Sequence, residues 1–339
     1  MTAAAATIAV VRISVDRFLS RCNVIGRFLL APAAFLVTFS YETMAADCTA
    51  TVPAENKATK TWTTSRAKQS AAKWTQGRIF EHVVIVVFEN HDYDEVMSNT
   101  VFKSVGERGA VFSRFVGSYH PSYPNYLAMV GARYFGTVGD DQTIIDSANA
   151  TIVDELEGKG LTWSAYAERY AGQCVLDEND ATLLYRRKHV PFLSFASITE
   201  NPNRCEKVVN FEGFDWKRLP NYSFVTPDMC NDGHDREGCT GETTQIARAA
   251  AWLEKFLAPT LENPDLLDQT LVVITFDESR SYKHNHVYTA FLGGMVKPGG
   301  RENACLDHFN VLRTIEENFS LTPLGGEDSR SAPITAVWK

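Results

Sequence analysis

Two uninterrupted runs of β-branched and other apolar residues dominate the pattern of hydrophobic and polar positions along the chain. They span residues 82–88 and 271–276. A short run without polar alternation is typical of a strand buried on both faces, as in a parallel sheet. Weaker strand patterns are predicted at residues 110–116, 161–167, 222–226 and 287–292.

Segments with helical periodicity alternate with these strands. They span residues 125–131, 152–159, 243–257 and 309–319. Strands that alternate with helices predict an α/β fold with a mostly parallel central sheet flanked by helices. Residues 171–220 are polar and contain Cys and Pro, so we expect a loop-rich insertion there. The length of 339 residues allows two domains or one large α/β domain.

The first 46 residues have a different pattern. Four arginines precede an apolar run at residues 28–39, and small residues follow at Ala45 and Ala46. This is the pattern of a signal peptide, and the apolar run is short for a membrane span. We therefore expect residues 1–46 to be a signal peptide, residues 47–78 to be an extended lead-in, and the chain to be secreted without stable membrane insertion after signal removal. An uncleaved signal anchor is the alternative.

The cysteines fit an exported chain. Of the seven, Cys22 lies in the expected signal peptide, and the remaining six allow several disulfide connectivities, with Cys230 and Cys239 as the most local pair. Three N-glycosylation sequons predict a glycoprotein; they begin at Asn149, Asn221 and Asn318.

Composition and charge narrow the class of protein further. The chain is 45% hydrophobic and 22% charged, which is usual for a globular protein and excludes a disordered or fibrous chain. Its formal net charge of -8 lacks the basic footprint of a nucleic-acid-binding protein, so we expect no nucleic-acid partner.

Polar side chains follow both strong strands at the point where each ends. Glu89 and Asn90 come directly after the first, and Asp277 and Glu278 after the second. Ligands of open α/β sheets bind beyond the carboxyl ends of strands, so these side chains are expected at one edge. Their oxygens favour a divalent cation such as Mg, Ca or Mn over Zn. Acidic residues also cap helices that follow strands, and the spacing leaves both interpretations open.

A serine lies near the start of a predicted helix. Pro124 is favoured in the first turn of a helix, which places Ser122 at the helix N-terminus. The unpaired N–H groups and the helix dipole there favour an anion such as phosphate. Beside a bound cation, the hydroxyl can ionise and attack phosphorus. Ordinary N-capping by Ser122 is the alternative.

A third polar segment, residues 226–235, also follows a predicted strand. His234 can protonate a leaving oxygen or bind phosphate, and Asp232 can orient it or bind a metal. The Asn-Asp-Gly sequence there equally suits a polar turn. The chain contains no G-x-S-x-G, H-E-x-x-H, P-loop or G-x-G-x-x-G motif. This argues against an α/β-hydrolase esterase, a zincin, an NTPase and a dinucleotide oxidoreductase.

Five segments, taken in order, resemble the phosphoesterase family of secreted acid phosphatases and phospholipase-C-like enzymes, which belongs to the alkaline-phosphatase-like superfamily. These segments are residues 89–94, 120–126, 226–235, 274–278 and 293–294. The resemblance extends over residues 80–325. It implies one phosphoesterase catalytic domain over residues 79–339, with the α/β sandwich of that superfamily.

The resemblance also implies roles at matching positions. It implies metal ligands at Glu89, Asn90, Asp277 and Glu278. It implies that Ser122 is the nucleophile and that His234 is an acid/base residue. Phosphate would be contacted by Asn125, His120 and His189. Asp228 stands where fungal relatives are expected to carry Asn, and it receives no role.

The sequence therefore predicts a secreted, metal-assisted acid phosphatase that hydrolyses small phosphate monoesters through a phosphoserine intermediate. A phospholipase-C-type phosphodiesterase on the same scaffold is one alternative, although the acidic net charge disfavours anionic membranes. A catalytically inactive secreted phosphate-binding protein is another. The physiological substrate and the oligomeric state stay open.

Overall fold

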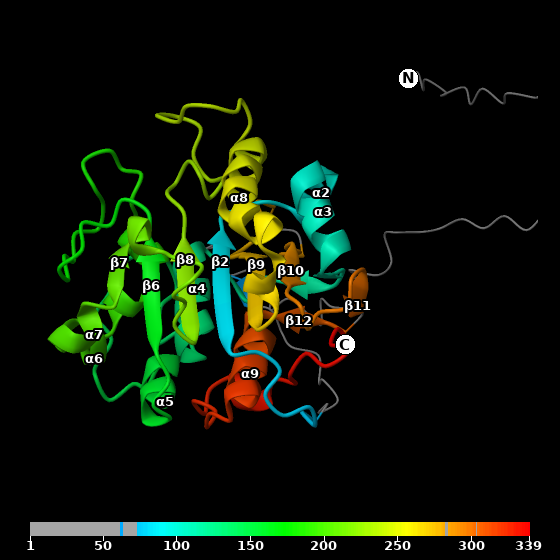
Figure 1. Ribbon diagram of the computed structural model, residues 1–339. Coiled ribbons are helices and arrows are strands. Elements are labelled where there is room, and N and C mark those ends of the chain that lie inside the picture. The colour runs from blue at the N-terminus through cyan, green and yellow to red at the C-terminus, as the bar shows by residue number, and fades with distance from the viewer. Residues whose placement is uncertain (1–61, 64–72, 282–283, 303) are drawn as a thin grey trace, which may run out of the picture. The chain divides into compact units, whose positions relative to one another are not determined.

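The computed structural model describes residues 62–63, 73–281, 284–302 and 304–339. The expected signal peptide and most of the expected lead-in lie outside these residues. Within them, an eight-stranded sheet forms the centre of the fold (Figure 1), with the strand order β11-β3-β10-β9-β2-β8-β6-β7.

All strands of this sheet except one run in the same direction. The parallel strands are β2 (His82–Phe88), β3 (Ala110–Phe112), β6 (Trp163–Ala167), β7 (Val208–Asn210), β8 (Tyr222–Thr226), β9 (Thr270–Phe276) and β11 (Gly300–Glu302). The exception is β10 (Thr289–Leu292), which is antiparallel to β3 and β9. The expectation of a mostly parallel sheet is confirmed.

The two strong apolar runs of the sequence form the adjacent central strands β2 and β9. They are paired in parallel register from His82 opposite Thr270 to Phe88 opposite Phe276. Apart from half-buried His82, every residue of the two strands is buried. Such unbroken burial follows from helices on both faces of the sheet, which is why polar residues do not alternate in these runs.

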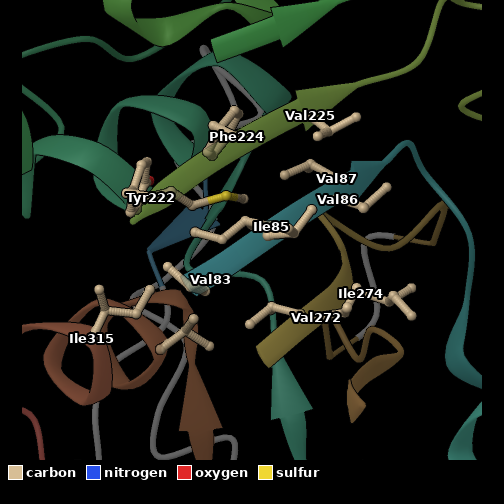
Figure 2. Packing of buried hydrophobic residues seen from close by; sticks show 14 of the residues in the cluster. Val83, Ile85, Val86, Val87, Tyr222, Phe224, Val225, Val272, Ile274 and Ile315 are labelled. Atoms are coloured by element: carbon tan, nitrogen blue, oxygen red, sulfur yellow. The ribbon is translucent and has the colours of Figure 1, made fainter. Parts of the chain in front are cut away.

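Helices cover both faces. On one face lie α3 (Thr100–Arg108) and α8 (Gln245–Glu262), and on the other lie α4 (Ser122–Gly131), α5 (Ile152–Gly158) and α9 (His308–Phe319) (Figure 1). Alternate residues of β2 contact the two layers. Phe88 packs against Phe102 of α3 and Trp252 of α8, whereas Ile85 faces Ile315 of α9. Figure 2 shows the β2 side chains packed among those of β8, β9 and α9.

The structure differs from the sequence pattern in three places. The expected strand over residues 110–116 is divided into β3 and β4 (Phe115–Val116) by a turn, and β4 pairs with β12 (Leu306–Asp307). Residues 93–108, for which no element is predicted, form α2 (Tyr93–Ser98) and α3. The segment 171–220 contributes short helices and the edge strand β7, because β6 offers β7 an unpaired backbone edge.

Two disulfides join described cysteines. Cys230 pairs with Cys239, as expected for the most local pair, and Cys174 pairs with Cys205. Cys305 is disulfide-bonded as well. Among the described residues, no helix has the length and apolar character needed to cross a membrane.

Two of the three sequons, those of Asn149 and Asn318, have different surroundings in the folded chain. Asn149 lies in a loop between exposed neighbours. Asn318 is buried, and its amide oxygen accepts hydrogen bonds from the backbone N–H groups of Ile79 and Phe80 at 2.7 and 3.2 Å. Its amide nitrogen donates to the Phe80 carbonyl at 2.9 Å. The folded structure therefore commits the Asn318 amide to hydrogen bonds within the protein, and glycosylation of the chain stays a prediction.

Candidate active site

Three buried carboxylates meet at the carboxyl ends of β2 and β9. Glu89 directly follows β2, and Asp277 and Glu278 directly follow β9. The pairing of the two strands continues beyond their ends, because the backbone N–H of Asp277 donates to the Phe88 carbonyl at 3.0 Å. All three carboxylates are at most 3% exposed. None of them caps a helix, so the capping interpretation of these acids is wrong.

The hydroxyl of Ser122 lies between two of these carboxylates. Ser122 is the first residue of α4, and its Oγ is 3.1 Å from Glu89 Oε2 and 3.2 Å from Glu278 Oε1. The N-cap of α4 is Pro121, and no side chain caps this helix. Ser122 therefore does not act as a cap. Its hydroxyl instead belongs to the acidic cluster.

Asn90 joins the same cluster. Its Nδ2 donates to Glu278 Oε1 at 3.2 Å, and its backbone N–H donates to Asp277 Oδ1 at 3.4 Å. Its φ of 26° is in the left-handed region, which Asn tolerates better than most residues and which turns the chain sharply after β2. Within the described structure, the buried atoms Asn90 Oδ1 and Asp277 Oδ2 have no hydrogen-bond partner.

Two of the three predicted histidines contact these carboxylates. His189 Nε2 is 3.2 Å from Glu89 Oε1, and its ring stacks on Tyr126 at 4.8 Å between centroids. His120 Nδ1 is 2.5 Å from Glu278 Oε2. Burial and the neighbouring Lys188 hold the pKa of His189 well below its usual value. This favours a neutral imidazole, which can accept as well as donate a hydrogen bond.

His234 stands at the border of the site. It is half-buried, and its Nδ1 is 2.7 Å from Asp235 Oδ1. Burial lowers its pKa, but the carboxylates of Asp235 and Glu89 more than offset this and raise the pKa above the usual value. No hydrogen bond joins it to Ser122 in the described structure. Its expected role as a proton donor stays a prediction.

Asn125 is held by hydrogen bonds inside the loop that precedes Ser122. Its Oδ1 accepts hydrogen bonds from Ser118 Oγ and the Tyr119 backbone N–H, at 2.9 and 2.8 Å. Its Nδ2 donates to the carbonyls of Tyr119 and Pro121, at 2.9 and 3.3 Å. Contact with a phosphate oxygen would compete with four hydrogen bonds inside the loop. The structure therefore favours a positioning role, in which Asn125 shapes the loop that precedes Ser122.

Several residues that the sequence analysis passed over belong to the site. The Nζ atom of Lys188 donates to Asp140 Oδ2 at 2.9 Å. Burial lowers the pKa of Lys188, but the carboxylates of Glu89 and Asp140 raise it overall, so Lys188 carries a positive charge beside the cluster. Tyr126 donates its hydroxyl to Glu89 Oε1 at 2.7 Å. The only sequence signal was proximity, since Lys188 adjoins His189 and Tyr126 follows Asn125.

His91 connects the segment that follows β2 with the loop of residues 226–235 and with the end of β9. It is fully buried, and its Nδ1 is 2.8 Å from Glu95 Oε2 while its Nε2 is 3.0 Å from the Gly233 carbonyl oxygen. Its ring makes an edge contact with Phe276, the residue before Asp277. A Cβ on Gly233 would lie 3.1 Å from His91 Nε2, and the φ of Gly233 is +94°, so both contact and backbone favour glycine.

The donor set fits a hard divalent cation. Burial raises the pKa of Glu89, and burial together with the charge of Glu89 raises the pKa of Asp277. Like charges buried together are costly unless a cation compensates them. The partnerless oxygens of Asn90 and Asp277 are atoms such a cation could use. No three His, Cys, Asp or Glu side chains among the described residues form a ready-made metal-binding group. The fit therefore rests on donor chemistry and burial.

Comparison with known proteins identifies the family of the chain. The model of the Phosphoesterase family matches residues 98–322. A probable acid phosphatase from Kluyveromyces lactis is 37% identical over 276 residues, which cover 77% of this chain and 63% of the relative. An acid phosphatase from Aspergillus fumigatus is 32% identical and covers 75% of this chain and 58% of the relative. The chain thus spans about three fifths of the length of these fungal proteins.

Two further relatives bear on family and fold. A phosphatidylinositol-3-phosphatase from Mycobacterium tuberculosis is 32% identical, and the match covers 76% of this chain and 83% of the relative. A solved Vibrio parahaemolyticus structure from the alkaline phosphatase superfamily superposes with a TM-score of 0.52 at 12% identity, over 77% of this chain and 71% of the other. That superposition supports the fold. Together with the matched family model, these relatives show that the chain belongs to the Phosphoesterase family.

Proposed function

We propose that this protein is a secreted, metal-assisted acid phosphatase that hydrolyses phosphate monoesters through a phosphoserine intermediate. The observation that carries the proposal is the position of the Ser122 hydroxyl, which lies at the start of α4 and between the carboxylates of Glu89 and Glu278. A buried serine in such surroundings can lose its proton to a neighbouring base and attack phosphorus. The acid phosphatase relatives support the same reaction class.

The charges around Ser122 explain why a cation is part of the proposal. A phosphate ester that approaches Ser122 meets the carboxylates of Glu89 and Glu278, which repel it. Lys188 supplies one compensating positive charge. A divalent cation held by Glu89, Asn90, Asp277 and Glu278 would lower the pKa of the serine hydroxyl and offset the charge of the phosphoryl oxygens.

The remaining groups have separate tasks in this proposal. The N-terminus of α4, His120 and His189 bind the phosphoryl oxygens through hydrogen bonds. Asn125 shapes the loop before Ser122. His234, whose pKa is raised by Asp235 and Glu89, is protonated in mildly acidic solution and donates its proton to the leaving oxygen. Water then hydrolyses the phosphoserine and releases phosphate.

The compartment follows from the same proposal. Both disulfides between described cysteines, Cys174–Cys205 and Cys230–Cys239, are compatible with an oxidising environment outside the cytosol. The second one closes the loop that contains Asp232 and His234. We therefore propose that the protein acts after export, where this loop stays cross-linked.

Substitution of the nucleophile tests the proposal. Ser122→Ala is expected to lower kcat on p-nitrophenyl phosphate by at least about 1,000-fold, because it removes the proposed nucleophile. Ser104→Ala, an exposed serine on α3, is the matched control and should keep full activity. Circular dichroism and thermal unfolding establish that both variants fold. Near wild-type activity in Ser122→Ala would refute the assignment.

Substrate comparison addresses the alternatives. The hydrolysis rates of p-nitrophenyl phosphate, a phosphatidylinositol phosphate and phosphatidylcholine should be compared. We expect one of the two phosphate monoesters to be hydrolysed fastest and the diester phosphatidylcholine to be hydrolysed more slowly. Preferred cleavage of phosphatidylcholine would identify a phosphodiesterase of the phospholipase-C type. Binding of vanadate without turnover of any ester would identify an inactive phosphate-binding protein.

A further inference from the structure

A separate pocket of about 590 Å³ lies between α8 and the segment 211–216. None of the residues that contact Ser122 lines it. Its wall is unusually rich in aromatic rings, which belong to Phe211, Phe214, Trp216, Trp252 and Phe256. A concave apolar space of this size is within the range that small ligands occupy in proteins, roughly 300–1,000 Å³.

The five rings form one continuous surface. Trp252 and Phe256 stack with centroids 5.0 Å apart and planes 12° apart, and Phe214 packs against Phe256 at 5.1 Å. Phe211 extends this surface by its contact with Trp252 at 5.4 Å. Phe211 and Phe214 are only half-buried, so part of each ring faces the pocket. Aromatic faces held rigidly in this way favour another flat ring, through stacked or edge contacts.

The charged groups of the wall are largely engaged within the protein. The Glu168 carboxylate accepts hydrogen bonds from the Asp228 backbone N–H, Asn231 Nδ2 and Trp252 Nε1, at 2.9, 2.8 and 2.8 Å. Arg248 is buried and donates to the backbone carbonyl of Glu242 at 2.8 Å. Since the Glu168 carboxylate and the two terminal nitrogens of Arg248 already have hydrogen-bond partners within the protein, the pocket offers a ligand mainly aromatic surface.

The edge of the pocket is polar without a dominant charge. Glu242 and Lys255 are exposed there and have opposite charges, and Asn231 and Thr240 add neutral polar groups. A polar substituent on a bound ring could therefore reach water and these side chains, whereas a strongly charged ligand gains little.

We propose that this pocket binds an uncharged aromatic ring that carries a hydroxyl or similar polar substituent, with the ring against Trp252 and Phe214 and the substituent at the edge. The proposal goes beyond phosphate hydrolysis, because the recognised group contains no phosphate. Asn231 lines the pocket and directly precedes Asp232. The ligand would therefore bind beside the loop of residues 226–235 without contacting Ser122.

Equilibrium binding of 2-naphthol, measured by isothermal titration calorimetry on the full chain, tests the proposal. The comparison ligand is decahydro-2-naphthol, which has the same carbon skeleton and hydroxyl group without aromaticity. We expect saturable binding of 2-naphthol at a single site and at least about fivefold weaker binding of the saturated ring, because stacking favours the flat ring. Equal affinities, or no saturable binding of 2-naphthol, would overturn the proposal.

Two variants locate the binding site. Ala251→Trp fills the pocket from an exposed position on its wall and should weaken 2-naphthol binding at least tenfold. Glu254→Trp adds the same side chain at an exposed position of α8 outside the pocket and should leave the affinity unchanged. Equal effects of the two substitutions would contradict the location.

A third, milder variant separates loss of ligand binding from loss of folding. Phe214→Leu removes one half-buried ring and keeps an apolar side chain, and it should also weaken 2-naphthol binding while thermal unfolding stays cooperative. Unchanged affinity in Phe214→Leu would count against the assigned wall. The result is independent of Ser122 chemistry, because no phosphate ester takes part. Hydrolysis of p-nitrophenyl phosphate by Ala251→Trp should stay at the wild-type level.

Discussion

Two groups of buried carboxylates in this protein have opposite surroundings. The strand-end cluster consists of Glu89, Asp277 and Glu278, which lie beside the Ser122 hydroxyl and two histidines. The α9 pair consists of Glu316 on α9 and Asp328 in a short helical turn, with Arg313 nearby. Burial raises the pKa of a carboxyl group in both places.

The difference lies in what else each group contacts. Burial and the neighbouring Asp328 raise the pKa of Glu316 to about 9, so Glu316 is protonated at neutral pH and can share its proton with Asp328. No histidine contacts this pair in the described structure, and the hydroxyl of exposed Ser329, 3.4 Å from Asp328 Oδ1, is closer to the Gly326 carbonyl oxygen at 3.0 Å. The strand-end cluster instead combines acids, a hydroxyl, imidazoles and the charge of Lys188. A buried acid therefore indicates chemistry only when groups of complementary chemistry surround it.

Neutralising one acid in each group is the strongest way to break this comparison. Glu89→Gln should lower kcat/KM on p-nitrophenyl phosphate by more than about 100-fold, because it removes a proposed metal ligand beside Ser122. It should also abolish the rise in Tm that Mg²⁺ or Mn²⁺ gives the wild type. Without added metal its Tm should equal or exceed the wild-type value, because the neutral amide relieves the repulsion among buried carboxylates.

Glu316→Gln provides the matched control, with the same chemical change at an equally buried glutamate. It should keep wild-type kcat/KM and the wild-type response of Tm to divalent metal. Equal losses of activity in the two variants would show that the two groups do not differ as argued.

Substitution of His91 tests whether this residue positions the strand-end cluster. We expect a smaller loss of activity than for Glu89→Gln. His91→Ala should lower kcat by about 10- to 100-fold. This is the usual range for residues that orient metal ligands without binding the metal themselves. His91→Gln should recover part of this loss, because its amide can still donate toward the Gly233 carbonyl. The control is His82→Ala, at the opposite end of β2, which should keep full activity. Comparable activities in His91→Ala and His82→Ala would eliminate the positioning role.

The smallest effect concerns stability and the α9 pair. The folded-state pKa of Glu316 is about 9 against an ordinary value of 4.5, so the folded chain holds a proton that the unfolded chain loses between these values. Its stabilising contribution is complete below pH 4.5 and falls by at most about 1.4 kcal/mol per pH unit as the pH rises toward 9. Glu316→Gln removes this dependence.

Urea unfolding at several pH values measures this effect. Relative to wild type, Glu316→Gln should be progressively more stable from pH 5 to pH 8. The exposed Glu254→Gln should follow the wild-type profile. A constant difference between Glu316→Gln and wild type across that range would mean that Glu316 does not bind the extra proton.

Much of the site could be predicted from the sequence, because several of its residues directly follow a strand in the chain. Glu89 and Asn90 follow one apolar run and Asp277 and Glu278 follow another, so the parallel pairing of β2 and β9 brings them together. Ser122 was found in the same way, from the proline that marks the start of α4. These inferences hold because parallel strands share one carboxyl edge.

Other features could not be predicted, because they depend on contacts between distant segments. Lys188 acquires its place through Asp140 and Glu89, and His91 through Gly233, which is far away in the sequence. The sequence motif predicts that Asn125 contacts phosphate. In the structure, both its amide oxygen and its amide nitrogen form hydrogen bonds within the surrounding loop. The aromatic pocket also combines parts of the chain that are separated in the sequence, namely Glu168, residues 211–216, Asn231 and residues 240–256.

By itself, the sequence determined the alternation of strands and helices, the acids at two strand ends and the family to which the chain belongs. These depend on short-range periodicity and on motifs that survive in linear order. Only the tertiary structure decided which polar groups are engaged and which can act. Asn318 reads as a glycosylation site in the sequence, but folding commits its amide to Ile79 and Phe80. The physical reason is that a buried polar group must find its hydrogen-bond partners wherever the packed chain places them.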